Sequence, residues 1–97
     1  MSAASYIDPD ARVHPSAVIG GGTSVWAFAV ITREVKIGAF CAIGTHTFIG
    51  EYAVLGDRVR VMGQCYIPTR ITIGNDVFIG PGAAFTGDRY QIGRAHV

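Results

Sequence analysis

An aliphatic residue recurs at every sixth position of this 97-residue chain, without an insertion, through most of its length. Four residues after each aliphatic residue comes an uncharged residue that is small or β-branched, from Ala11 to Ala83. A period of six drifts around an α-helix, whereas two inward side chains spaced two residues apart match the period of a β-strand. The repeat therefore predicts a succession of short strands. The thirteen aliphatic positions are Ile7, Val13, Ile19, Val25, Ile31, Ile37, Ile43, Ile49, Leu55, Val61, Ile67, Ile73 and Ile79.

Glycine often follows the aliphatic residue directly, and it predicts where the chain turns. Glycine accepts backbone angles and close approaches that a Cβ excludes, so each of these positions indicates a corner. Three strands with their corners occupy eighteen residues and form one triangular coil, and each strand then pairs in parallel with the strand eighteen residues away. We expect an all-β, single-stranded parallel β-helix of about 4–5 triangular coils. The seven glycines are Gly20, Gly38, Gly44, Gly50, Gly56, Gly74 and Gly80.

Composition and charge exclude several classes of function. Eight Lys and Arg residues against seven Asp and Glu residues give a net charge of +1, too little to hold nucleic acid or anionic lipid. No apolar stretch approaches the ~20 residues of a membrane span, and the N-terminus lacks a signal-peptide pattern, so we expect a cytoplasmic protein. Cys41 and Cys65 lack the spacing of a zinc site, and His14 and His46 fall in different columns of the repeat, so we expect no metal.

The repeat defines one domain, residues 6–90, and the sequence changes character after it. Arg89 occupies a position that should point inward, and Ile92 begins a corner-like pair that is one residue out of phase. The last residues, Ile-Gly-Arg-Ala-His-Val, can be encoded by a common sequencing adapter. We therefore expect residues 91–97 to be a non-native or disordered tail, and the natural protein to continue further.

One of the three predicted faces is almost free of charge, whereas the other two are mixed or charged. Large contiguous apolar patches rarely face water on a monomer, so we expect this face to pack against symmetry mates in a homotrimer. The alternative is a set of scattered apolar side chains that remain exposed. The outward residues of this face are Phe28, Val30, His46, Phe48, Gln64 and Tyr66.

Hexads such as Ile43-Gly-Thr-His-Thr-Phe and Ile73-Gly-Asn-Asp-Val-Phe resemble those of the left-handed β-helix acyltransferases, over residues 6–90. Thr23-Ser-Val-Trp26 and the run from Asn75 to Tyr90 are similar to N-acetyltransferases that act on amino groups of nucleotide-linked sugars. The resemblance implies a left-handed coil, a homotrimer, acetyl-CoA as co-substrate and a nucleotide-linked amino sugar as partner. It also implies a role in lipopolysaccharide or other surface-polysaccharide synthesis.

The chain departs from the pattern of those enzymes at several positions. Where they commonly carry histidines after the tryptophan, this chain has Ala27 and Val30. Where they commonly carry Gln-Asn it has Met62-Gly63, and their Asn-Asp pair is Gly87-Asp88 here. These departures bear on which substrate is used.

Acetyl transfer to a sugar amine needs an acceptor for the departing proton and groups that orient the amine. We expect His46, which the repeat places on a strand of the apolar face, to be the general base or an amine-orienting group, the alternative being an interfacial hydrogen bond. Gln64 is expected to orient the substrate, unless it only packs, and Trp26 to stack on a base or pantetheine arm, unless it only packs. The family pattern places a substrate contact at Asp88, the alternative being a frayed end.

Two other functions stay open on these residues. One is a non-catalytic β-helix that serves as an assembly scaffold, and the other is an O-acetyltransferase of the same fold. No activated Ser or Cys is apparent, so an enzyme of this kind is expected to transfer the acetyl group directly. Because coils and a cap that help to hold CoA are expected to be missing, we predict weak or no activity for this length of chain.

Overall fold

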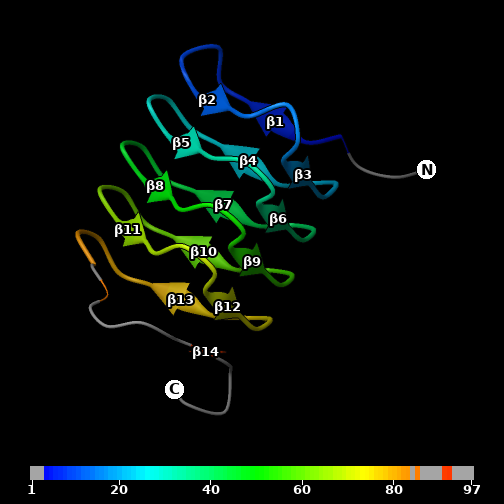
Figure 1. The fold of residues 1–97 in the computed structure, drawn as a ribbon. Coiled ribbons are helices and arrows are strands. Elements are labelled where there is room, and N and C mark those ends of the chain that lie inside the picture. The colour runs from blue at the N-terminus through cyan, green and yellow to red at the C-terminus, as the bar shows by residue number, and fades with distance from the viewer. Residues whose placement is uncertain (1–3, 84, 86–90, 93–97) are drawn as a thin grey trace.

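The computed structural model describes residues 4–83, 85 and 91–92, and within them the secondary structure consists of two-residue strands joined by turns. The strands stack in successive coils along one axis, as Figure 1 shows. Their bounds are β1 Tyr6–Ile7, β2 Arg12–Val13, β3 Val18–Ile19, β4 Ser24–Val25, β5 Val30–Ile31, β6 Lys36–Ile37, β7 Ala42–Ile43, β8 Phe48–Ile49, β9 Val54–Leu55, β10 Arg60–Val61, β11 Tyr66–Ile67, β12 Thr72–Ile73, β13 Phe78–Ile79 and β14 Gln91–Ile92.

Three parallel sheets form the walls of a prism. The first wall contains β1, β4, β7, β10 and β13, the second contains β2, β5, β8 and β11, and the third contains β3, β6, β9, β12 and β14. Ile31 pairs with Ile49 and Ile37 pairs with Leu55, which is the predicted spacing of eighteen residues. The prediction of an all-β, parallel β-helix is therefore confirmed, and the described strands complete about four coils.

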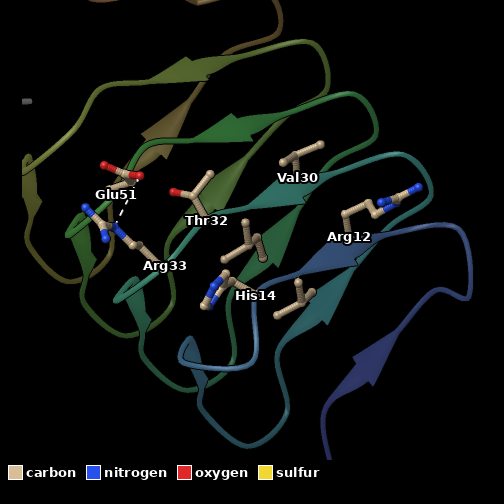
Figure 2. Close-up of a pocket in the computed structure, with 8 residues that line it drawn as sticks. Arg12, His14, Val30, Thr32, Arg33 and Glu51 are labelled. Atoms are coloured by element: carbon tan, nitrogen blue, oxygen red, sulfur yellow. Dashed lines mark ion pairs between the residues drawn. The ribbon is translucent and has the colours of Figure 1, made fainter.

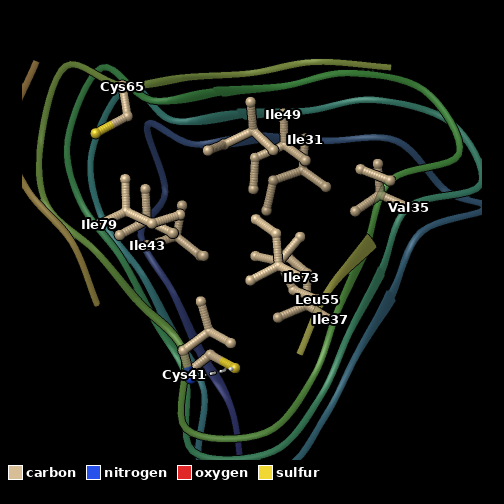
Figure 3. Close-up of a cluster of buried hydrophobic side chains, with 14 of the residues drawn as sticks. Ile31, Val35, Ile37, Cys41, Ile43, Ile49, Leu55, Cys65, Ile73 and Ile79 are labelled. Carbon is tan, nitrogen blue, oxygen red and sulfur yellow. Dashed lines mark hydrogen bonds between the residues drawn. The ribbon is translucent and has the colours of Figure 1, made fainter. Parts of the chain in front are cut away.

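The interior of the prism is filled by the aliphatic column that the repeat predicted. Ile43 and Ile49 are fully buried, and Leu55 is 2% exposed. Viewed along the axis, these side chains point inward from all three walls (Figure 3). Ile7 in the first coil is 41% exposed, because no described strand lies beneath it. The core is therefore sealed in its middle coils and open at its first coil.

Two positions of the six-residue repeat determine the geometry of the corners. Glycine after the strand permits close stacking: a Cβ on Gly44 would lie 2.6 Å from the backbone nitrogen of Gly63 in the next coil. Two residues later the backbone adopts positive φ, a conformation that side chains other than glycine rarely take. That position is occupied by Phe28, Glu34, Phe40, His46, Tyr52, Arg58, Gln64, Arg70 and Asp76, with φ between 56° and 64°.

The last described strand departs from the regular register. Gln91 pairs with Thr72 and Ile92 pairs with Ile73, a spacing of nineteen residues in place of eighteen. This agrees with the one-residue phase change that the sequence shows at Ile92. The inward position expected for Arg89 lies outside the described residues, as does most of the expected tail, so the domain boundary at residue 90 stays a prediction.

Candidate functional site

Three of the predicted face residues form a column at the corner between the first and second walls. His46 lies in the turn between β7 and β8, at φ 56°, with Phe28 one coil before it and Gln64 one coil after it. The interpretation that His46 sits on a strand was therefore wrong, because only two residues of each hexad pair as strand. Backbone hydrogen bonds between successive coils hold this column together, because the Gln64 N–H donates to the Thr45 carbonyl at 2.8 Å.

The imidazole of His46 packs against an aromatic ring and keeps its edge free. The ring centroids of Phe28 and His46 are 5.2 Å apart with an interplanar angle of 23°, so the two rings are stacked. His46 is exposed, and none of the described residues forms a hydrogen bond with its ring nitrogens. In a stacked pair the imidazole nitrogens lie at the edge of the ring, so they do not face the Phe28 ring. This arrangement can accept a proton from a group that approaches along the edge of the ring.

Aromatic and apolar side chains extend this column onto the second wall. Phe48 and Tyr66 point outward from β8 and β11, and their rings stack at 5.6 Å with an interplanar angle of 4°. They are 39% and 46% exposed, and the outward residue of β5 beside them is Val30. The structure therefore brings together the six residues of the predicted apolar face as one corner column and one strand column. The charged residue of this wall, Arg12, lies in its first coil.

Trp26 lies at the same corner but faces the first wall. It directly follows β4, and its ring centroid is 5.2 Å from that of Tyr6 on β1, with an interplanar angle of 49°. Trp26 is 45% exposed, so a planar group can still reach it. Among the described residues, no ring contact joins Trp26 to His46. The fourth predicted site residue, Asp88, lies outside the described residues.

Both cysteines point inward at corners and use their thiols structurally. The Cys41 thiol donates to the Gly56 carbonyl at 3.1 Å, and the Cys65 thiol donates to the Gly80 carbonyl at 3.2 Å. Burial raises the pKa of the Cys41 thiol above its ordinary value, which keeps it neutral. A buried neutral thiol is a poor nucleophile.

Two hollows lie on the second wall at the N-terminal end of the prism, and sequence reasoning did not foresee them. The larger, about 510 Å³, is lined by Arg12, Val13, His14, Val30, Ile31, Thr32, Arg33 and Glu51 (Figure 2). The smaller, about 420 Å³, is lined by Pro9, Asp10, Ala11, Arg12, Phe28 and Val30. The polar residues at its corner come from two adjacent columns of the repeat, His14 with Thr32 and Arg33 with Glu51, so a comparison made one column at a time does not show that the two pairs meet.

Metal-binding clusters and membrane-spanning helices are both absent from the part of the chain that the structure describes. Within it, no group of three or more His, Cys, Asp or Glu side chains is placed to hold a metal ion. The same residues include no helix that could cross a membrane.

The family described as bacterial transferase hexapeptide (six repeats) matches residues 52–87. Together with the three-walled stack of six-residue units, this match decides the fold. The chain is a hexapeptide-repeat β-solenoid. A search of curated proteins found no match.

Solved structures similar to this β-solenoid are acetyltransferases. A mutant of perosamine N-acetyltransferase from Caulobacter crescentus, in complex with CoA and GDP-perosamine, is 24% identical with a TM-score of 0.72, covering 93% of this chain and 51% of that chain. The acetyltransferase domain of PglB from Neisseria gonorrhoeae is 26% identical with a TM-score of 0.71, covering 90% of this chain and 51% of that chain. The same domain in complex with acetyl coenzyme A is 25% identical with a TM-score of 0.73, covering 96% and 53%. This β-solenoid thus spans about half the length of the structures it resembles.

Proposed function

We propose that this chain is the β-helix part of an acetyl-CoA-dependent N-acetyltransferase that acts on an amino group of a nucleotide-linked sugar. The observation that carries the proposal is the exposed, stacked imidazole of His46 on the apolar corner of a fold shared with acetyltransferases. The PglB domain binds acetyl coenzyme A, and perosamine N-acetyltransferase binds CoA and GDP-perosamine. We assign the protein to cytoplasmic synthesis of a surface polysaccharide, in keeping with these substrates.

In the proposed reaction, His46 accepts the proton that the sugar amine loses. The amine nitrogen attacks the thioester carbonyl, a C–N bond forms, and the C–S bond breaks. The proton held on the imidazole then passes to the departing thiolate, so the transfer leaves no charge on the enzyme. In this proposal Gln64, one coil on, orients the sugar, and Asp88 is a further substrate contact. Trp26 offers a ring for a base or the pantetheine arm.

The apolar column of the second wall supports a homotrimer. Phe48, Tyr66 and Phe28 are large exposed side chains on one side of the prism, and burying them in water-free contact is favourable. A three-walled prism packs naturally around a three-fold axis. In such a trimer, His46 lies at the edge of the interface, where a cleft between subunits can hold both substrates.

Turnover assays test the catalytic proposal. Because this length of chain is expected to have weak or no activity, the full-length version is incubated with acetyl-CoA and a panel of nucleotide-linked amino sugars, GDP-perosamine among them, and free CoA is measured. His46→Asn keeps a residue that tolerates positive φ, and we expect kcat/KM to fall about 100-fold or more. The matched control is Phe40→Asn, at the same corner position with φ 57° on another corner, and it should leave kcat/KM unchanged.

Three other outcomes decide among the alternatives. No turnover with any sugar contradicts the enzyme and favours an assembly scaffold. A product that alkali hydrolyses is an ester, which indicates O-acetylation, whereas an amide survives. Equal activity of the His46→Asn variant and the wild type removes His46 from the role of base.

A further inference from the structure

The larger hollow of the second wall gathers polar side chains at one end and apolar ones along its floor. Figure 2 shows His14, Thr32, Arg33 and Glu51 close together at the corner between the second and third walls, with Arg12 at the opposite end, its guanidinium directed away. The floor between them is formed by Val13, Val30 and Ile31. A hollow of about 510 Å³ has the size of a small-molecule site.

The hydrogen-bonding state of these side chains favours an anion. The N–H of Ser16 donates to His14 Nδ1 at 3.1 Å, so the neutral ring carries its proton on Nε2 and presents a donor. Arg33 Nε lies 3.3 Å from a Glu51 carboxylate oxygen, which leaves the terminal nitrogens of Arg33 free to donate.

The charge of the hollow points the same way. Two arginines, Arg12 and Arg33, line it against the one carboxylate of Glu51. The Arg12 guanidinium is directed away from the hollow, so Arg33 is the cation that faces a ligand there. Arg33 also lies over the ring of Tyr52, at 5.6 Å from the centroid, which limits where its guanidinium can move.

The hollow is connected to the candidate catalytic column. The smaller hollow shares Arg12 and Val30 with the larger one and extends to Phe28. Phe28 is the ring on which His46 stacks. A continuous strip thus runs along the second wall from the donors at the Arg33 end to the imidazole at the other end.

We propose that the Arg33 end of this hollow binds a phosphoryl group of one substrate, while the rest of that substrate extends along the apolar floor toward His46. This inference rests on the proposed function, because both a nucleotide-linked sugar and acetyl-CoA carry phosphates. The guanidinium of Arg33 and the Nε2–H of His14 donate to the phosphate oxygens. Glu51 weakens phosphate binding, because its carboxylate pairs with Nε of Arg33.

Calorimetric titration of the purified chain at low salt tests the site without catalysis. The probes are UDP, GDP, CoA and inorganic pyrophosphate. We expect Arg33→Gln to weaken binding about 5- to 10-fold and Glu51→Gln to tighten it about 3-fold, since the contacts are partly exposed. The matched control is Arg70→Gln: Arg70 packs on the same Tyr52 ring, at 4.5 Å, but does not line the hollow, so binding should be unchanged.

The outcomes separate this inference from the proposed function. Binding of UDP or GDP above CoA places the nucleotide-linked sugar in the hollow, and the reverse order places CoA there. Equal weakening by Arg33→Gln and Arg70→Gln, or no binding of any probe, overturns the site. If the chain turns over while Arg33→Gln leaves KM for both substrates unchanged, the enzyme stands and the phosphate site falls.

Discussion

Glu34 has φ 59°, and its N–H donates to Ser16 Oγ at 2.9 Å. Eight other non-glycine residues take the same backbone conformation at the same position of the repeat. Such a conformation costs about 1–2 kcal/mol in an L-residue, and more for a β-branched one. The stacking of coils holds these residues there, because the backbone N–H at this position reaches the coil before it, as from Phe40 to the Gly21 carbonyl at 2.9 Å.

We therefore predict that Glu34→Val lowers the free energy of unfolding by about 1–2 kcal/mol, because a β-branched side chain clashes with the backbone at positive φ. Glu34→Asn should be neutral or slightly stabilising, since Asn tolerates this conformation. The control is Lys36→Val, an exposed position on β6, where a β-branched residue suits the strand. Urea denaturation of the three variants measures the differences, and equal effects of both valines would contradict the prediction.

The sequence predicted the glycines of the corners but not the strained position. Glycine recurs directly after the strand, as at Gly44, so the residue type itself indicates a corner at that position of the repeat. The positive-φ column holds Phe, Glu, His, Arg and Gln side chains with no common chemistry, so nothing in the residue types marks it. For that reason the repeat predicts a strand at His46, which lies in a turn.

Strands in the middle of the prism have neighbours on both sides, whereas those of the first coil have a neighbour on one side only. Ile43 on β7 pairs with strands before and after it and is fully buried. Ile19 on β3 pairs only with β6 among the described strands and is partly exposed. Isoleucine residues at equivalent positions of different coils therefore contribute different amounts to the free energy of unfolding.

We predict that Ile43→Ala lowers the free energy of unfolding by about 3–4 kcal/mol, as for a large side chain deleted from a closed core. Ile19→Ala should cost about 1–2 kcal/mol, because the site is already partly hydrated. Thermal and urea denaturation of both variants give the comparison. A larger loss for Ile19→Ala would mean that the first coil is covered by something the described residues do not include.

Inward positions were predictable in full because period and burial agree at each inward residue from Val25 to Ile79. The hollow at Arg33 was not, because it depends on how two consecutive corner positions of neighbouring coils meet. His14 and Glu51 contribute to it from different columns. Columns follow from arithmetic on the sequence, but the space between columns depends on side-chain geometry.

The oligomeric state is a property of the whole molecule. We predict that the wild-type chain sediments as a trimer of the 10.3 kDa chain, and that Phe48→Lys shifts it toward monomer by burying a charge in the interface. The control is Phe78→Lys on the first wall, where Phe78 is 63% exposed outside the apolar face. Sedimentation equilibrium distinguishes the species. Dissociation by both variants, or by neither, would move the interface elsewhere.

The eighteen-residue register limits how such a chain can change length. Inserting six residues after Gly44 would keep every later inward side chain inside, so a prism would still form. It would also rotate all later outward residues onto the next wall, carrying His46 away from Phe28 and separating the ring pair of Phe48 and Tyr66 from Val30. Only an insertion or deletion of eighteen residues, one whole coil, keeps every outward side chain on its wall. The fold therefore tolerates insertions of six residues that would disrupt the candidate site.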